Sequence, residues 1–413
     1  MTEIYDVLLP VRARKVLTEF AELHRIERTT DITLEQSAGR VLAEDIKAKE
    51  QLPGFMRSTM DGFAVISSDL FGASDGIPAY LEYSGDILMG EHPTKKLLPG
   101  NCVRISTGGM LPPGADAVVM VEYTRQAENM IEVVRSVSPG ENVLFADEDY
   151  AAGADALPRG AKIRPQEAAL LAGLGYKSVK VHDKLKIGLL STGDEVINPW
   201  DNVGPGKIRD MNSYSLASAL VLEGYNVISF GIARDEKDEL VRKIAQAIKE
   251  CDVVIISGGS SVGARDTTLL AMEEMSNNPP MFHGISVRPG KPTLFAEIEG
   301  KPVIGLPGPP VSALMIYKVF FSAFLYKLAG NNREKRELGQ RAVLSRNLPS
   351  VPGREDYIRV RLHTENGHNI AEPIFGKSGL ISTLVAADGY IVISEGVEGL
   401  LAGSDVDVRF FWE

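Results

Sequence analysis

Hydroxyls, glycines and carboxylates follow two predicted buried strands near the middle of the chain. Residues 191–195 read Ser-Thr-Gly-Asp-Glu and residues 257–263 read Ser-Gly-Gly-Ser-Ser-Val-Gly, each directly after a short apolar run. Glycines let backbone N–H groups approach a phosphate closely, and a helix that begins after such a loop adds the positive end of its dipole. We therefore expect Ser257, Gly258 and Gly259 to contact phosphate groups.

Two carboxylates beside these loops could hold a metal ion. Asp266 ends the second loop and would repel a bare phosphate, so it is better explained as a Mg²⁺ ligand, with Glu195 of the first loop as its partner. Asp266 also precedes Thr267 and Thr268, and an Asp in that place commonly begins a helix as its N-cap. The double glycine could equally form an ordinary tight turn. Considered alone, neither loop decides between these alternatives.

A third region combines two cations with two stiff turns. Arg288 and Lys291 lie in Arg-Pro-Gly-Lys-Pro, and residues 305–310 read Gly-Leu-Pro-Gly-Pro-Pro. An arginine can clamp an oxyanion with two hydrogen bonds, whereas a lysine acts as a point charge. The region is either an anion pocket or a solvated turn that carries surface charges.

Further acidic and hydroxyl groups lie outside this central region. Asp61 precedes Gly62, and Thr107 stands in a Ser-Thr-Gly-Gly stretch after a predicted strand. Asp-Gly most often forms a turn, and isolated acids such as Asp149 and Asp235 are most often solvated or cap helices. These residues gain a functional interpretation only from their companions elsewhere in the chain.

The elements that must position these loops alternate between strand and helix. Apolar runs at 187–190, 226–231, 253–256 and 303–306 predict buried strands, and helical periodicity separates them. Such alternation predicts a doubly wound, mostly parallel sheet, in which ligands bind beyond the carboxyl ends of the strands. All three candidate loops leave those ends.

Outside this unit the sequence pattern changes. A chain of 413 residues predicts roughly two to four domains. Predicted helices precede and follow a region of short apolar runs that Gly and Pro residues separate. In the last part of the chain, apolar and polar residues alternate as in β-strands. We predict a helical linking domain (1–50 and 145–183), an inserted β domain (51–144), an α/β domain (184–330) and a C-terminal β domain of barrel type (331–413).

Composition restricts the partners and the compartment. The net charge of −11 gives no overall attraction for nucleic acid or an anionic membrane, and the beginning of the chain lacks the pattern of a secretory signal. The two cysteines, Cys102 and Cys251, lie in apolar runs, which is typical of reduced, buried thiols. We expect a cytoplasmic protein that binds neither nucleic acid nor membrane.

Taken in order, the motifs resemble one family, the molybdopterin molybdenumtransferases, which include the E domain of gephyrin. The likeness extends over essentially the whole chain, and several short motifs in the same order are more specific than any one of them. The motifs are Met-Asp-Gly-Phe-Ala at 60–64, Ser-Thr-Gly-Gly at 106–109 with Pro-Pro-Gly-Ala-Asp-Ala-Val-Val at 112–119, the loops at 191–195 and 257–266, Arg-Pro-Gly-Lys-Pro at 288–292 and Gly-Leu-Pro-Gly-Pro-Pro-Val-Ser-Ala at 305–313.

The resemblance implies an enzyme that inserts molybdate or tungstate into adenylylated molybdopterin, releases AMP and uses Mg²⁺, with some functional groups supplied across a homodimer interface. It implies Mg²⁺ ligation by Glu195 and Asp266. The implied catalytic positions are Asp61, Thr107, Asp149, Glu195, Asp235 and Asp266. The implied binding positions are Ser257, Gly258, Gly259, Arg288, Lys291, Pro307, Arg354 and Ser378.

Four positions depart from the usual family pattern. Arg288 stands where Lys is common and keeps the charge, whereas Pro309 replaces an Asn and Ser260 and Thr267 replace a Val and a Tyr. The lost amide and ring alter contacts to the nucleotide. Two other functions stay open: adenylylation of molybdopterin by ATP, which the same α/β unit would serve, and a scaffold role of the gephyrin kind without catalysis.

Overall fold

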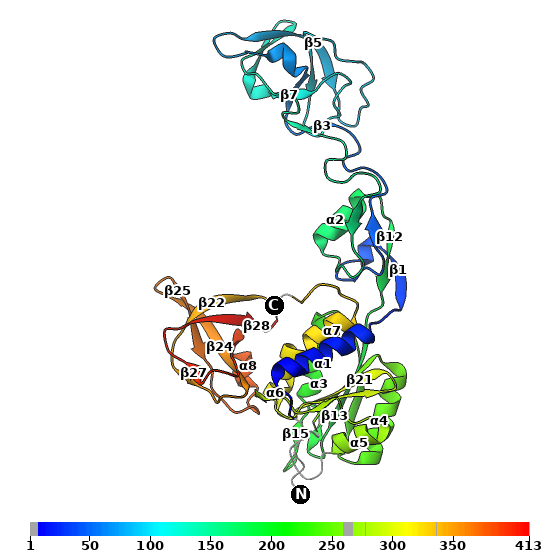
Figure 1. The fold of residues 1–413 in the computed structure, drawn as a ribbon, viewed down its shortest axis with the longest axis vertical. Coiled ribbons are helices and arrows are strands. Elements are labelled where there is room, and N and C mark those ends of the chain that lie inside the picture. The colour runs from blue at the N-terminus through cyan, green and yellow to red at the C-terminus, as the bar shows by residue number, and fades with distance from the viewer. Residues whose placement is uncertain (1–6, 259–266, 277, 336, 413) are drawn as a thin grey trace.

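A computed structural model describes residues 7–258, 267–276, 278–335 and 337–412 of the chain. The molecule is elongated, with the inserted β domain at one end, the α/β domain at the other and the linking domain between them (Figure 1). The C-terminal barrel lies beside the α/β domain. The multidomain α/β and β architecture predicted from the sequence is confirmed.

The α/β domain is built on a six-stranded sheet of order β16-β13-β17-β21-β20-β18. The first four strands in this order run parallel, β20 is antiparallel to β21, and β18 is antiparallel to β20. Every residue of β17 is buried, as expected for a central strand covered on both faces. The bounds are β13 (Lys186–Thr192), β16 (Asn226–Ala233), β17 (Val253–Ser257), β18 (Phe282–His283), β20 (Leu294–Ile298) and β21 (Lys301–Leu306).

Helices cover both faces of this sheet, and the alternation of side chains along β17 shows which helices lie on each face. Val253 and Ile255 belong to the core shared with α3 (Asn212–Leu222), whereas Val254 and Ile256 face α4 (Lys237–Glu250) and α5 (Thr267–Met275). The sheet is therefore doubly wound. The long segment after β21 divides into α6 (Pro310–Ile316), the π-helical turn η4 (Tyr317–Phe321) and α7 (Ser322–Leu328).

Residues 310–328 form the one helical segment, within the described ranges, whose length and composition would let it cross a membrane. Its most apolar window is 67% buried inside the protein, against the α/β sheet and α1. We interpret it as a core helix.

Helix α1 (Pro10–Leu23) begins with a proline, whose fixed φ suits the first helical turn. Its buried residues Ala13, Leu17 and Phe20 share one core with α7 and the α/β sheet. The sequence places this helix with the linking domain, but it packs on the α/β domain (Figure 1).

The linking domain contains more strand than the predicted helical domain. Its elements are α2 (Pro165–Gly173), the turn η1 (Leu34–Gln36), the antiparallel pair β1 (Thr29–Thr33) and β12 (Ser178–His182), and the pair β2 (Ile46–Lys47) and β11 (Asp155–Leu157). Only Ile32 is buried in β1, so the strand lacks the alternation that would have revealed it in the sequence.

The inserted domain is a six-stranded β structure of order β7-β4-β6-β5-β9-β8, as predicted. Strands β3 and β10 pair where the chain enters and leaves this domain. The bounds are β3 (Arg57–Ser58), β4 (Gly62–Val65), η2 (Ser67–Leu70), β5 (Ala79–Ile87), β6 (Asn101–Ile105), β7 (Ala117–Met120), η3 (Val121–Tyr123), β8 (Thr124–Ala127), β9 (Met130–Val133) and β10 (Val143–Leu144).

The C-terminal domain is a closed five-stranded barrel, because β24 pairs with both β25 and β26 and closes the order β24-β25-β22-β28-β26. Strand β19 (Val287–Arg288), which precedes β20, adds to β24 from outside. The bounds are β22 (Gly339–Leu344), β23 (Leu348–Pro349), β24 (Glu355–Glu365), β25 (His368–Pro373), α8 (Ser382–Val385), β26 (Gly389–Ile393), β27 (Gly399–Leu400) and β28 (Asp405–Phe410).

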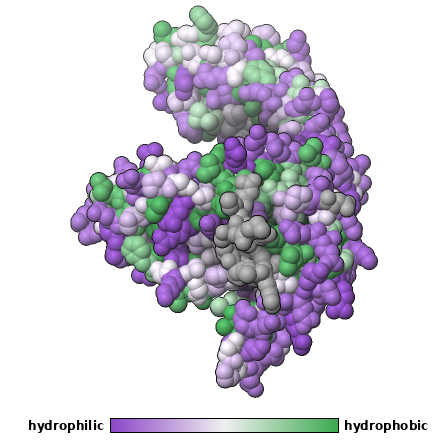
Figure 2. Space-filling model, turned by 60° about the horizontal axis from the view of Figure 1, so that its bottom comes forward, coloured by the Kyte–Doolittle hydropathy of each residue, from purple (hydrophilic) through white to green (hydrophobic). Residues whose placement is uncertain are grey.

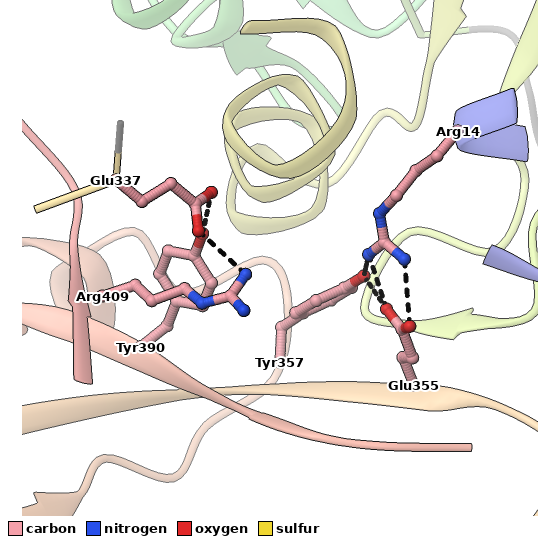
Figure 3. Close-up of polar contacts among 6 residues, drawn as sticks. All are labelled: Arg14, Glu337, Glu355, Tyr357, Tyr390 and Arg409. Carbon is pink, nitrogen blue, oxygen red and sulfur yellow. Dashed lines mark hydrogen bonds and ion pairs between the residues drawn. The ribbon is translucent and has the colours of Figure 1, made fainter. Parts of the chain in front are cut away.

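Charged side chains hold the barrel against α1 and against the segment that leads into it (Figure 3). Arg14 donates to both carboxylate oxygens of Glu355, at 3.0 and 2.7 Å, and to the Tyr357 hydroxyl at 2.9 Å. Arg409 of the barrel forms a second ion pair, at 2.9 Å, with Glu337 in the segment that leads into the barrel. The fork-to-fork geometry of the Arg14 contact makes it the stronger of the two.

We expect Arg14→Met to lower the free energy of unfolding by about 2 kcal/mol, because Glu355 loses charge-assisted hydrogen bonds at a half-buried position. The matched control on the same helix is Lys15→Met, which removes an exposed pair with Glu19 and should cost less than about 0.5 kcal/mol. Urea unfolding followed by tryptophan fluorescence measures both values, since Trp412 lies at the end of the barrel. Equal effects of the two substitutions would contradict the assigned role of Arg14.

The same contact predicts a pH dependence. Burial opposes ionisation of Glu355, but hydrogen bonds from Arg14 and Tyr357 outweigh it and lower the pKa of this carboxyl below its ordinary 4.5. A lowered folded-state pKa gives stability that is present above pH 4.5 and is lost as the pH falls through the lowered value. Arg14→Met should reduce this loss in acid titrations of stability.

Candidate functional site

A cavity of about 880 Å³ opens at the carboxyl ends of the parallel strands of the α/β domain, where the sequence predicts ligand binding. The loop after β13 contributes Thr192 and Glu195, the loop after β17 contributes Ser257 and Gly258, and Asp235 follows β16. Its other described lining residues are Ser191, Gly193, Val196, Ile208, Arg209, Asp210, Met211, Asn212, Pro292, Gly308, Pro309, Pro310 and Gly379.

Asn212 joins three of these loops. It stands at the start of α3 with 9% of its surface exposed, and its amide donates to Ser257 Oγ at 2.6 Å and to the Gly308 carbonyl at 2.8 Å. The sequence analysis missed this residue, because a polar residue at the beginning of a helix is usually interpreted as a cap. Its two partners lie 45 and 96 positions away, so local pattern carries no sign of its role.

Gly258 holds the second loop close to the first. It has a φ of +105°, and a Cβ atom built there would lie 2.2 Å from the Thr192 carbonyl oxygen. Its N–H also donates to the Leu306 carbonyl at 3.2 Å. Only glycine allows this approach, so Gly258 is needed for the packing of the two loops.

Three carboxylates border the cavity. Asp235 accepts a 2.7 Å hydrogen bond from Thr192 Oγ1, and Asp210 accepts the Ser213 N–H at 3.0 Å, whereas Glu195 is exposed. Asp210 is a further residue that the sequence analysis missed. Hard oxygen donors of this kind suit Mg²⁺, which commonly takes one or two carboxylates and completes its shell with water and phosphate oxygens.

Of the two metal ligands predicted from the sequence, only Glu195 lies within the described residues. Asp266, the second expected ligand, and Gly259 lie outside the described residues, as does Ser260. Within the described ranges no group of three or more His, Cys, Asp or Glu side chains is placed to hold a metal ion by itself. The residues present therefore fit a Mg²⁺ ion that shares its shell with a bound substrate.

The predicted cations lie along the seam between the α/β domain and the barrel. Arg288 and Lys291 are exposed and are not among the described residues that line the cavity, although the adjacent Pro292 is. Arg354 pairs with Asp356 at 2.7 Å, so its charge is already compensated. Strand pairing places Arg288 beside Asp356 in the same seam.

The barrel reaches the cavity through one loop. The Ser378 carbonyl accepts the Val311 N–H at 3.1 Å at the start of α6, and Gly379 lines the cavity. Pro307 is buried directly before Gly308 and shapes the turn that leads to α6. Ser378 and Pro307 therefore lie at the border of the cavity, as backbone elements.

Three predicted residues lie far from the cavity. Thr107 donates from its N–H and from Oγ1 to Asp61 Oδ1, at 2.8 and 3.2 Å, on the surface of the inserted domain. Asp149 is exposed where the chain leaves that domain, and its N–H donates to Leu52. The inserted domain lies at one end of the elongated molecule and the α/β domain, which carries the cavity, lies at the other (Figure 1). A deep notch separates the inserted domain from the main body (Figure 2).

Family models cover most of the chain. Residues 11–175 match the MoeA N-terminal region (domains I and II), residues 188–327 match a probable molybdopterin binding domain, and residues 341–411 match the MoeA C-terminal region (domain IV). The order of the matches follows the order of the domains in the structure.

Individual relatives match over almost the full length. The chain is 37% identical to a Methanocaldococcus jannaschii protein named for molybdopterin biosynthesis, over 97% of this chain and 98% of the relative. It is 31% identical to the molybdopterin molybdenumtransferase of Bacillus subtilis, over 98% and 95%. The crystal structure of a molybdopterin biosynthesis MoeA protein from Pyrococcus horikoshii OT3 superposes with a TM-score of 0.84 at 31% identity, over 98% of this chain and 100% of that one.

Gly258→Ala should destabilise the α/β domain by about 2 kcal/mol or more, because the new Cβ would combine a strained φ with a collision against backbone. Gly308→Ala is the matched control on the same cavity, since its Cβ would have no neighbour nearer than 3.9 Å. Thermal unfolding of the two variants measures the difference. A Gly258→Ala protein as stable as Gly308→Ala would refute the close approach of the two loops.

Proposed function

Because the chain belongs to the MoeA family of molybdenum cofactor biosynthesis proteins, we propose that it is a molybdopterin molybdenumtransferase. It takes adenylylated molybdopterin, inserts molybdate or tungstate at the dithiolene and releases AMP. The observation that carries this proposal is the cavity at the carboxyl ends of β13, β17 and β21, where hydroxyls, glycine backbone and carboxylates converge. Its volume of about 880 Å³ lies in the range of pockets that enclose a small organic ligand.

The residues of the loops bind and orient the phosphates. Ser257 and Gly258 lie at the end of β17 and line the cavity, where a hydroxyl and glycine backbone can contact an anionic group. The Asn212 amide donates to the Ser257 hydroxyl and to the Gly308 carbonyl. These two groups are thus held in place before a substrate arrives, which is the condition for electrostatic catalysis.

The carboxylates Glu195 and Asp266 would hold Mg²⁺, with Asp235 kept in position by Thr192. When bound, the ion neutralises the negative charge of the phosphate groups and of the leaving AMP. Without a cation these carboxylates would repel the substrate. A Mg²⁺-dependent reaction therefore accounts for acidic residues in a phosphate site.

Arg288 and Lys291 would attract the anionic reactants from the seam beside the cavity. Both are exposed, and no ion pair to a described carboxylate ties either side chain down. Their role is to position molybdate or tungstate and the pterin phosphate. Molybdate and tungstate have nearly the same size and charge, so both are proposed substrates.

We further propose that the active enzyme is a homodimer. Asp61 and Thr107 are joined to each other on the inserted domain and lie at the far end of the same chain from the cavity. A second subunit could bring them to the first subunit's cavity by twofold symmetry.

We also propose a cytoplasmic location, since Cys102 and Cys251 are free and buried, and burial raises their pKa to about 12 and about 11.

Glu195→Gln and Asp266→Asn should each lower the rate of molybdate-dependent AMP release by about a hundredfold or more, because each removes a charged metal ligand without opening a core cavity. The measurement is AMP release from adenylylated molybdopterin in the presence of Mg²⁺, with molybdate and tungstate supplied in turn. Glu236→Gln, an exposed acid beside Asp235, is the control and should keep wild-type activity. An unchanged rate in Glu195→Gln, or consumption of ATP with bare molybdopterin, would overturn the proposed reaction.

Mixing two inactive variants tests the shared site. Asp61→Ala and Glu195→Gln should each be inactive as homodimers, but a co-expressed mixture should recover about a quarter of the wild-type activity, because half of the dimers then contain one site without substitutions. Activity in the co-expressed sample is compared with that of the same two proteins assayed separately. No recovery would show that Asp61 acts within its own chain or not at all.

A further inference from the structure

Two adjoining cavities lie where the linking domain, the α/β domain and the segment leading into the barrel meet. The inner cavity has a volume of about 170 Å³ and the outer one about 790 Å³, and Lys162, Glu223, Tyr225 and Tyr326 border both. The described residues that line them are all different from those that line the candidate active site. The junction is therefore a separate feature of the fold.

The carboxylate of Glu223 is largely buried at this junction and already has three partners. Both of its oxygens accept hydrogen bonds, from Tyr317 at 2.9 Å and from Ser322 at 2.6 Å, and Lys335 adds a 2.9 Å ion pair. The Glu223 side chain is only 8% exposed. Its one direct ion pair is with Lys335, and it attracts Lys162 and Lys318 only from a longer distance.

Two further lysines, Lys162 and Lys318, face the outer cavity without a carboxylate partner among the described residues. Lys318 instead lies over the Trp412 ring, at 5.1 Å from its centroid. Of the acids on this cavity, Glu337 is paired with Arg409 (Figure 3), and Glu334 is exposed to solvent. Lys162 and Lys318 thus form no direct ion pair with a described carboxylate, and only longer-range attraction from Glu223, and for Lys318 also from Glu337, offsets their charge.

The surroundings of the two lysines lower the pKa of each, in agreement with this geometry. The pKa of Lys318 and that of Lys162 are each lowered, first by burial and then by repulsion from Lys335. Protein side chains seldom enclose several cations without a matching anion, because the cost of desolvation is then not repaid. An anion in the cavity would offset the repulsion, because it attracts all three lysines.

The inner cavity ends on two buried polar side chains with unsatisfied atoms, although the Asn331 amide nitrogen donates to the Tyr326 carbonyl at 2.8 Å and the Ile26 backbone faces the His182 ring. His182 is 2% exposed and Asn331 is 4% exposed, and neither ring nitrogen of His182 nor Asn331 Oδ1 has a hydrogen-bond partner of normal geometry among the described residues. Gly330 fixes the imidazole, since a Cβ there would lie 2.7 Å from His182 Cδ2. Burial and the nearby Arg159 lower the pKa of His182, so the neutral ring offers one donor and one acceptor.

We propose that this three-domain junction binds a phosphate group, either as free phosphate or as the phosphomonoester of a small molecule. The phosphate lies between Lys162, Lys318 and Lys335, and the rest of a monoester extends past Tyr225 and Tyr326 to hydrogen-bond with His182 and Asn331. The ligand contacts all three parts of the junction and so restrains their relative orientation. This inference is independent of the proposed function.

Isothermal titration of the full chain with inorganic phosphate, AMP and adenosine tests the proposal. Lys318→Gln and Lys162→Gln should each weaken phosphate binding by at least about tenfold, because each removes a charge-assisted contact. Lys15→Gln, on the exposed face of α1, and the double variant Arg288→Gln/Lys291→Gln, beside the candidate active site, should bind phosphate as the wild type does. Unchanged melting temperatures establish that the variants are folded. If one of the two lysine variants does not fold, the other still carries the test.

The outcomes separate this site from the active site. No phosphate binding by the wild type, equal binding by every variant, or loss only in Arg288→Gln/Lys291→Gln would overturn the proposal. Tighter binding of AMP than of phosphate, lost in Lys318→Gln or Lys162→Gln but kept in Arg288→Gln/Lys291→Gln, with no binding of adenosine, would support it and identify a phosphomonoester as the ligand. Equal binding of AMP and phosphate with the same dependence on the two lysines would support free phosphate, and AMP binding that no junction variant weakens would assign AMP to the active-site cavity and count against the proposal. None of these measurements depends on molybdate insertion, so failure of the proposed reaction would leave this test intact.

Discussion

Parallel pairing among β13, β17 and β21 is the constraint on which the cavity depends. The register aligns Ser191 with Ser257 and Ser257 with Leu306, so the three loops leave the sheet at the same level. The apolar side chains of these strands are buried on both faces, so a shift in register would misalign the two layers of helices as well as the loops. Hydrophobic packing therefore determines where the polar site lies.

The other domains complete the site through polar contacts. Arg14 and Glu355 hold the barrel against α1, and this docking brings the loop at Ser378 and Gly379 to the border of the cavity. The inserted domain carries Asp61 and Thr107 at a distance from it. The α/β domain therefore carries most of the cavity, whereas the groups that the family resemblance implies are spread over the other domains as well.

Several elements could be predicted from sequence because burial imposes a regular period. The four parallel strands of the α/β sheet follow this rule, and the inserted and C-terminal β domains were recognised from alternation and turn residues, whereas β18 and β20 were not predicted. Strand β1 was missed because only one of its residues is buried, and α1 was grouped with its sequence neighbours although its apolar face packs on α7. Within the site, Thr192, Asp235, Ser257 and Gly258 do converge, whereas Arg354 is engaged by Asp356.

By itself, the sequence determined the family, the class of the α/β, inserted and C-terminal domains and the loops that would form the cavity, because motif order and hydrophobic period are local properties of the chain. Tertiary structure alone decided that Asn212 joins Ser257 to Gly308, and that Asp61 and Thr107 lie far from Glu195. It also decided that Lys162, Lys318 and Lys335 line one cavity with Glu223, whose only ion pair is with Lys335 among the described residues. Such relations join residues remote in sequence, and their distances depend on how whole domains pack, which no local pattern records.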